Sequence, residues 1–337
     1  MMNLVEALLT GDRLALARLL TQVENGTQDG FSALNELFPH TGKAHLVGVT
    51  GAPGVGKSSL VNQLAFHYRK QTNKTVAIIA VDPTSPFTGG AVLGDRVRMR
   101  SLAGDPGVFI RSMASRGTLG GLAHATSAMV QVFDAAGFDI VLIETVGAGQ
   151  AEVDIARLAH TTLVVEAPGM GDDIQAIKAG ILEIADILVI NKADHPGLEN
   201  TERALRGMLD MAHPVKHVFQ HHGKFEVVES HGEHQEDNSH LWTPPIQKTI
   251  ANDGTGIPEL ADSIENHVSY LESSGDWNLR ELSRLETELD ALIQDTLSNQ
   301  FRSKLPKETY DQVLADILRR KLSPWEAVKT LMNGRLA

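Results

Sequence analysis

The sequence predicts an α/β protein built on a doubly wound, mostly parallel sheet, with helical extensions at both ends. Three observations predict it. Between residue 45 and about residue 265, short apolar runs alternate with segments of helical periodicity. Most of these runs are continuously apolar rather than alternating, which is typical of strands covered on both faces. The first run leads into a glycine-rich loop and then a helix, the arrangement that a phosphate-binding loop requires.

Each predicted element follows from its local pattern. Residues 1 to about 40 carry apolar residues at helical spacing, with a break at Gly11-Asp12, and predict a small N-terminal helical cap. Apolar runs then predict strands at 45–50, 75–81, 108–112, 140–144, 161–166, 187–191 and 246–250. From Leu279 to Leu292, leucines recur every three or four positions and predict one long helix with an apolar stripe. Shorter helices are predicted around Leu314 and from Pro324.

These elements predict three parts: a helical cap at 1–44, an α/β domain at 45–265 that contains the glycine-rich loop, and a C-terminal helical arm at 266–337. A helical arm without a compact core of its own needs a surface to cover. We expect it to pack on the α/β domain or to join a second subunit.

The composition argues against several classes of protein. The formal net charge of −12 at pH 7 argues against a nucleic-acid backbone as the main partner. The 337 residues include no cysteine, which excludes disulfides, thiolate metal sites and cysteine nucleophiles. No apolar run approaches the ~20 residues that cross a bilayer, and no basic stretch precedes the first apolar residues. We therefore expect a cytoplasmic protein without a membrane span.

The strongest motif spans residues 51–59 and has the spacing of a phosphate-binding P-loop. Its residues are Gly51, Ala52, Pro53, Gly54, Val55, Gly56, Lys57, Ser58 and Ser59. Glycines let backbone N–H groups turn toward phosphate oxygens, and the N-terminus of the following helix adds partial positive charge. We expect Lys57 to reach the β- and γ-phosphates and the Ser58 hydroxyl to bind Mg²⁺. The chain is therefore predicted to bind a nucleoside triphosphate.

A second motif, Asn191-Lys192-Ala193-Asp194, directly follows an apolar run, as the guanine-reading motif of GTPases does. The Asp194 carboxylate can accept hydrogen bonds from the ring N–H and the exocyclic amine of guanine, a donor pair that adenine lacks. We expect Asn191 to tie the surrounding loops together and the stem of Lys192 to lie over the base. A backbone N–H at or near Ala251 could contact the guanine carbonyl, and a plain turn explains that segment equally well. The predicted ligands are GTP and GDP.

Candidate ligands for Mg²⁺ lie at strand ends that converge near the P-loop. Asp82 follows one predicted strand and Glu144 ends another. Together with Ser58 and Asp95 they offer the oxygen ligands that Mg²⁺ prefers. Helix capping is the alternative role for the aspartates, whereas for Glu144 we favour a contact with the metal or the γ-phosphate.

The segment from Glu144 to Gly147 has the form of the D-x-x-G switch of GTPases, with Glu in place of Asp. We expect the Gly147 N–H to contact the γ-phosphate. Ala148 stands where many small GTPases carry a water-positioning glutamine, and Gln150 lies two positions later. With Lys57, the residues Glu144, Gly147 and Gln150 form the predicted catalytic set, and intrinsic hydrolysis is expected to be slow.

Six segments resemble one known family in their order and spacing. They are GAPGVGKSS (51–59), VDPTSPFTGGAVLGDRVRM (81–99), RGTLGG (116–121), GFDIVLIETVGAGQAEVD (137–154), APGMGDDIQAIKAGILEIAD (167–186) and NKAD (191–194). The family is that of P-loop GTPases that act as chaperones of cobalamin-dependent acyl-CoA mutases, the ArgK/MeaB/MMAA type. Methylmalonyl-CoA mutase is the best-known client. The resemblance covers about residues 40–265 and extends more loosely into both helical ends.

This resemblance implies a site, moving parts and a task. The residues around Mg²⁺ and the phosphates would be Ser58, Asp82, Asp95 and Glu144. Segments 82–96, 144–154 and 168–178 would be switches, although the glycine-rich ones could equally be passive loops. The residues that relay nucleotide state to the mutase would be Asp172, Gln175 and Lys178. The C-terminal arm would form a homodimer. The task would be to gate adenosylcobalamin loading and to protect or reactivate the mutase, which would in turn accelerate hydrolysis.

One segment departs from the family pattern, because seven histidines lie between His213 and His240. Neutral imidazoles with nearby glutamates suit Zn²⁺ or Ni²⁺, and related GTPases that insert nickel carry such segments. A metal-insertion GTPase is therefore one alternative, and a merely solvated loop is another interpretation. A transport-associated kinase is a further alternative, which would use ATP. The chain has no Asp-x-His-x-x-Gly cobalamin motif, so it would act on a cobalamin enzyme rather than hold the cofactor.

Overall fold

The computed structural model describes most of the chain. The described residues are 3–82, 102, 104–114, 121–145, 151–169, 183–211, 220–221, 224–225 and 241–333. They fall into two compact units, Met1–Glu286 and Thr287–Ala337. None of the helices in these stretches is long and apolar enough to cross a membrane.

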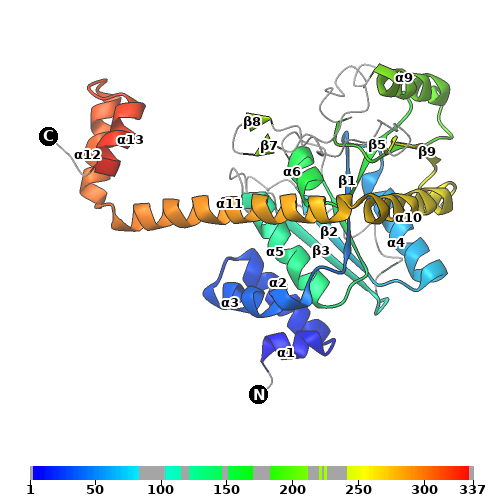
Figure 1. Cartoon of the computed structure of the whole chain (residues 1–337), viewed down its shortest axis with the longest axis horizontal. Coiled ribbons are helices and arrows are strands. Elements are labelled where there is room, and N and C mark those ends of the chain that lie inside the picture. The colour runs from blue at the N-terminus through cyan, green and yellow to red at the C-terminus, as the bar shows by residue number, and fades with distance from the viewer. Residues whose placement is uncertain are drawn as a thin grey trace, which may run out of the picture. The chain divides into compact units, whose positions relative to one another are not determined.

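The first unit is organised around a seven-stranded, all-parallel sheet (Figure 1). Its strands are β1 (His45–Gly51), β2 (Val76–Asp82), β3 (Val108–Ala114), β4 (Ile140–Glu144), β5 (Thr161–Glu166), β6 (Ile187–Asn191) and β9 (Ile246–Thr249). Their order is β3-β2-β4-β1-β5-β6-β9. The predicted α/β class with its parallel sheet is therefore confirmed. Because Ile250 leaves the sheet to bridge Thr255, the last strand ends one residue before the prediction.

Helices cover both faces of this sheet, which explains why its strands are continuously apolar. On one face, Leu163 and Val165 of β5 pack in a core with α4 (Lys57–His67) and α10 (Ile257–Ser274). On the opposite face, Val164 packs with Leu205 of α9 (Leu198–Met211). The same face is covered further along by α5 (Gly121–Ala135) and α6 (Ala151–Leu158).

A glycine inside β1 lets α6 approach the sheet closely. A Cβ atom added to Gly48 would lie 2.7 Å from Ile155 Cγ2 and 3.1 Å from the Ala159 Cβ. Any larger residue would push α6 away from the strand that leads into the P-loop.

The N-terminal segment forms three helices, α1 (Leu4–Leu9), α2 (Arg13–Glu24) and α3 (Gln28–Leu37), and then a short 3₁₀ turn (Phe38–His40). The predicted break at Gly11-Asp12 is present, with the Asp12 carboxylate capping α2. A second break, which was not predicted, precedes Thr27, the cap of α3. These helices share a hydrophobic core with α5.

The C-terminal helices are α11 (Asp276–Lys304), α12 (Lys307–Leu318) and α13 (Pro324–Asn333). Gly275, with a φ of +82°, separates α10 from α11. Helix α11 begins in the first unit and continues into the second, where α12 and α13 pack on each other. The predicted division at residues 44 and 265 stays a prediction; residue 265 itself lies within α10.

Two short elements complete the description. Helix α4 ends in a π-helical turn, Tyr68–Thr72. A small antiparallel hairpin, β7 (Gln220–His221) and β8 (Lys224–Phe225), lies within the histidine-rich segment. The rest of that segment, up to His240, lies outside the described residues.

Candidate nucleotide-binding site

The loop between β1 and α4 can be built only with glycine at two positions. Gly51 has a φ of +138°, and a Cβ atom there would lie 2.0 Å from the Val165 carbonyl oxygen. Gly56 has a φ of +96°, and its Cβ would lie 2.4 Å from Asn191 Nδ2. Both the left-handed backbone and the close contacts require glycine. The loop is therefore pressed against the ends of β5 and β6.

Lys57 begins α4 and is buried. Its ammonium Nζ donates hydrogen bonds to the carbonyl oxygens of Gly51, at 2.8 Å, and Ala52, at 2.9 Å. These bonds direct the cation along the inside of the loop. A cation at the start of a helix, surrounded by inward-turned backbone, forms a site for anionic oxygens.

Ser58, in the first turn of α4, and Glu144, at the end of β4, are brought together beside the P-loop. The Ser58 hydroxyl donates to Glu144 Oε1 at 2.5 Å, and both side chains are buried. Glu144 ends β4, where it pairs in register with Val49 of β1. A hydroxyl and a carboxylate oxygen in contact at the carboxyl edge of a parallel sheet are hard ligands of the kind Mg²⁺ takes. The residues described here therefore fit that ion.

Asp82 lies at the same edge of the sheet, because it ends β2, and Ala80 of that strand pairs with Glu144. Its side chain lies outside what the structure describes, as do the residues Asp95, Gly147, Gln150, Asp172, Gln175 and Lys178. Their predicted roles stay predictions.

Asn191 connects the P-loop with the loop that follows β9. Its Nδ2 donates to the Val55 carbonyl at 2.8 Å. Its Oδ1 accepts from the Thr249 hydroxyl and from the Ala251 N–H, both at 3.1 Å. The side chain is buried, so these bonds are protected from water. Three loops at the carboxyl edge of the sheet are thereby held as one body.

Lys192 and Asp194 follow on the turn after β6. Lys192 has a φ of +56°, uncommon for a non-glycine residue, and its Nζ donates to the Gly54 carbonyl at 2.7 Å. Its stem therefore crosses toward the P-loop. Asp194 is exposed beside it, where its carboxylate is accessible to a ligand.

Two features of this site were not predicted from the sequence. Thr249 supports Asn191 through a hydroxyl bond, and its only signal was its place at the end of the next strand. The Ala251 N–H donates to Asn191 Oδ1, a bond that the sequence did not indicate, and the predicted contact of an N–H at or near Ala251 with guanine stays a prediction.

The histidines of the described stretches do not form a metal site. Within the described stretches, no group of three or more His, Asp or Glu side chains is placed to hold a metal ion. Most of the histidine-rich segment lies outside those stretches, so metal binding there stays a prediction.

The sequence of the chain matches one known protein family over most of its length. Residues 16–305 match the family model described as methylmalonyl-CoA mutase-associated GTPase MeaB. The chain belongs to this family. As a MeaB-family protein, it is a GTPase. The roles of the P-loop and of Asn191 in binding the nucleotide stay predictions.

Relatives of the chain align with it over nearly its whole length. A Pyrococcus abyssi protein named only as a GTPase is 41% identical over 99% of this chain and 98% of its own. The Escherichia coli GTPase ArgK is 32% identical over 97% of this chain and 94% of its own. The crystal structure of a LAO/AO transport system kinase superposes with a TM-score of 0.65 at 25% identity, covering 99% of this chain and 98% of its own. The helical ends of this MeaB-family GTPase therefore belong to the shared architecture.

Proposed function

We propose that this MeaB-family GTPase is a GTP-dependent chaperone of a cobalamin-dependent acyl-CoA mutase, similar to methylmalonyl-CoA mutase. It would gate the loading of adenosylcobalamin and protect or reactivate the loaded enzyme. The family match supports the mutase as partner. The single observation that carries the switching part of the proposal is the joining of phosphate, metal and base regions by the buried contacts of Ser58 and Asn191.

The phosphates would be held by backbone N–H groups of residues 51–59 and by Lys57. Mg²⁺ would be held by Ser58 and Glu144, with Asp82 and Asp95 as further oxygen ligands. When bound, the ion would neutralise charge on the β- and γ-phosphates. The Gly147 N–H would contact the γ-phosphate, and Gln150 is the candidate for orienting water.

Guanine would be recognised by Asp194, whose exposed carboxylate can accept two hydrogen bonds from the base. Asn191 would hold the surrounding loops, and Lys192 would cover the base with its stem. The loop that begins at Ala251 would close the pocket on its remaining side. Adenine would be disfavoured because it would leave the Asp194 carboxylate without hydrogen-bond donors.

A route from the phosphates to the proposed third switch follows from the contact between Gly51 and β5. The Val165 carbonyl lies where a Gly51 side chain would be, so the end of β5 responds to any shift of the P-loop. Segment 168–178 begins two residues after β5 ends. Movement there would present Asp172, Gln175 and Lys178 to the mutase according to the nucleotide state.

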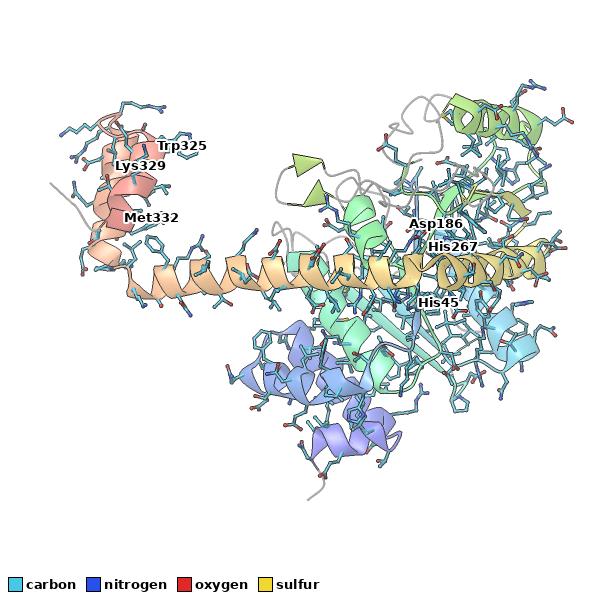
Figure 2. All side chains as sticks on the ribbon, viewed as in Figure 1. His45, Asp186, His267, Trp325, Lys329 and Met332 are labelled. Atoms are coloured by element: carbon cyan, nitrogen blue, oxygen red, sulfur yellow. The ribbon has the colours of Figure 1, made fainter. Side chains whose placement is uncertain are left out.

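The second unit supports the proposed homodimer. Many of its apolar side chains are exposed in the single chain. They are Leu289, Leu292, Ile293, Leu297, Phe301, Tyr310, Leu314, Leu318, Trp325, Val328 and Met332. Figure 2 labels Trp325 and Met332 on α13. Exposed apolar surface on this scale is typical of a protein–protein interface.

The proposal is tested with purified protein and purified methylmalonyl-CoA mutase. We expect a complex on size-exclusion chromatography whose stability differs between GTP and GDP, and a faster GTPase rate when the mutase is present. The Lys57→Ala variant should lose the nucleotide dependence of the complex. Absence of a complex, together with an unchanged GTPase rate, would overturn the proposal.

A further inference from the structure

A buried polar cluster lies at the edge of the sheet opposite the P-loop, where β1, β5 and β6 begin. We call it the amino-edge network. Its members are His45, His160, Thr161, Asp186, His267, Arg280, Glu281 and Arg284. Figure 2 shows His45, Asp186 and His267 gathered around α10. All members belong to the first unit. None of them takes part in the nucleotide site.

Three imidazoles lie in this network, and the Thr161 hydroxyl lies between two of them. Its oxygen is 2.8 Å from His267 Nδ1 and 2.8 Å from His45 Nε2. His267 Nε2 in turn lies 3.3 Å from Asp186 Oδ1. The first residue of β5 therefore connects the start of β1 with α10.

This order of hydroxyl, imidazole and carboxylate resembles a hydrolase triad, and its burial rules that role out. Thr161 and His267 have no exposed surface and Asp186 has 1%. No substrate can reach the hydroxyl. A structural role in fastening elements together explains the arrangement instead.

The first turns of α11 are fastened to the sheet by this network. Arg280 donates to both carboxylate oxygens of Asp186, at 2.8 and 2.7 Å, and to the His160 carbonyl at 2.8 Å. Glu281 Oε2 lies 3.3 Å from His160 Nε2. The Trp277 ring packs on the His160 ring with centroids 4.1 Å apart. His160 is therefore the point where α11 meets the start of β5.

A second proton on His160 would remove one of its contacts. His160 Nδ1 accepts the Leu46 N–H at 3.2 Å, so a proton on this nitrogen removes a buried hydrogen bond. Burial lowers the pKa of His160, against the opposing effect of Glu281. Burial also lowers the pKa of His45 well below its ordinary value, and the nearby His160 and His267 lower it further.

The charged groups around the rings come from every element packed there. Arg280 and Arg284 face them from α11, and Lys74 faces them from the segment before β2. Although burial opposes it, the charge of Arg280 holds the pKa of Asp186 far below its usual range. Although burial opposes it there too, His160 and Arg284 lower the pKa of Glu281 to about 2. Both carboxylates therefore stay ionised in mildly acidic solution.

We propose that the amino-edge network is an acid-sensitive latch, and that protonation of His45 and His160 releases the first turns of α11 from the sheet. The released state binds more protons than the latched state. Release is therefore favoured as pH falls through about 6.5, the ordinary value for histidine. Release caused by protonation of Asp186 and Glu281 would begin only below about pH 4, the ordinary range of carboxylates. This inference does not depend on the proposed chaperone function.

Hydrogen–deuterium exchange of the full-length protein tests the latch. Protection factors, corrected for the intrinsic effect of pH, are compared at pH 7.5 and 5.5 for α11 residues 277–286 and for α4. We expect the protection of α11 to fall by about tenfold at the lower pH while that of α4 changes little. Equal protection of α11 at both values would overturn the proposal.

Two substitutions separate the histidines from other titrating groups. His45→Gln keeps an N–H donor for Thr161, and His160→Asn keeps an acceptor for the Leu46 N–H, while neither new side chain titrates. The double variant should hold α11 at pH 5.5 as at 7.5. If the double variant fails to fold, His45→Gln alone is the test. This position is half-buried, and the substitution should move the fall in α11 protection to lower pH. His40→Gln, an exposed histidine outside the network, is the control. A transition unchanged in His45→Gln, or a fall in protection that persists in the folded double variant, would sink the idea.

Discussion

Lys57 places an ammonium group inside the P-loop, where its Nζ donates to the Gly51 and Ala52 carbonyls. A triphosphate offers charged oxygens, and a hydrogen bond between charged groups contributes about 1.5–3 kcal/mol. We expect Lys57→Ala to reduce GTP affinity or turnover by about 100-fold. Titration calorimetry and steady-state GTPase rates measure the effect. Lys70→Ala, which removes an exposed lysine after the same helix, should behave as the wild type.

Asp194 is the residue expected to select the base. Asn in its place would present a donor where guanine also has one, whereas xanthine has a carbonyl at that position. We expect Asp194→Asn to lose at least about 100-fold in GTP affinity and to gain affinity for xanthosine triphosphate. Competition binding with the two nucleotides gives the ratio. Unchanged GTP binding would mean that the guanine pocket lies elsewhere.

For single residues, the sequence predicted the site where the spacing of a motif fixes the chemistry of its side chains. The motif at 51–59 could be predicted from its spacing, and the proximity of Ser58 to Glu144 could be predicted because parallel strands end at one edge of the sheet. The bond from Thr249 to Asn191 could not, since a threonine at a strand end is usual on β-propensity alone. Its role depends on which strand becomes the neighbour of β6.

Among the elements, the strands were the most predictable, because a strand buried on both faces must be apolar along its whole length. The observed bounds differ from the predicted ones by two residues or fewer. The break before α3 was missed, although no apolar residue lies between Val23 and Phe31. There the capping hydroxyl of Thr27, which accepts from the Gly30 N–H, decides where the helix begins.

The segment that enters β1 is held by one carboxylate from α5. Asp134 accepts the backbone N–H groups of Gly42, Lys43 and Ala44, at 2.6, 3.1 and 3.0 Å. Asp134→Ala removes the acceptor for all three donors and should lower the free energy of unfolding by about 2–4 kcal/mol. Chemical denaturation followed by circular dichroism measures it. Asp29→Ala, at an exposed site in the first turn of α3, should change stability by less than about 0.5 kcal/mol.

The molecule as a whole divides into two units of different character. The first buries a sheet between helices, and the second consists of the end of α11 with α12 and α13. Sequence patterns predicted those helices correctly. They could not locate the amino-edge network, whose members His45 and Arg280 come from distant parts of the chain and meet only through the packing of α10 and α11.

Exposure of apolar side chains on the second unit leads to a prediction about assembly. Leu289 and Leu297 are 57% and 61% exposed on α11. We expect the wild type to be a dimer by light scattering and the variant with Leu289→Glu and Leu297→Glu to be a monomer, because a dimer would bury these charges. Ser298→Glu, an exposed polar position on the same helix, should leave the dimer intact. A wild type that is monomeric at all concentrations contradicts the assignment of this surface.

Asn191 has a consequence for how a ligand is recognised. Its amide nitrogen donates to the P-loop and its amide oxygen accepts from the loop after β9. Ordering the phosphate side of the pocket therefore also orders the base side. Guanosine and pyrophosphate, supplied as separate molecules, should then each raise the protein's affinity for the other by the same factor, as thermodynamic linkage requires. Calorimetric titration of one in the presence of the other measures that factor. The protein would thus recognise the base and the phosphates of GTP cooperatively. A ligand that lacks either the base or the phosphates should bind weakly.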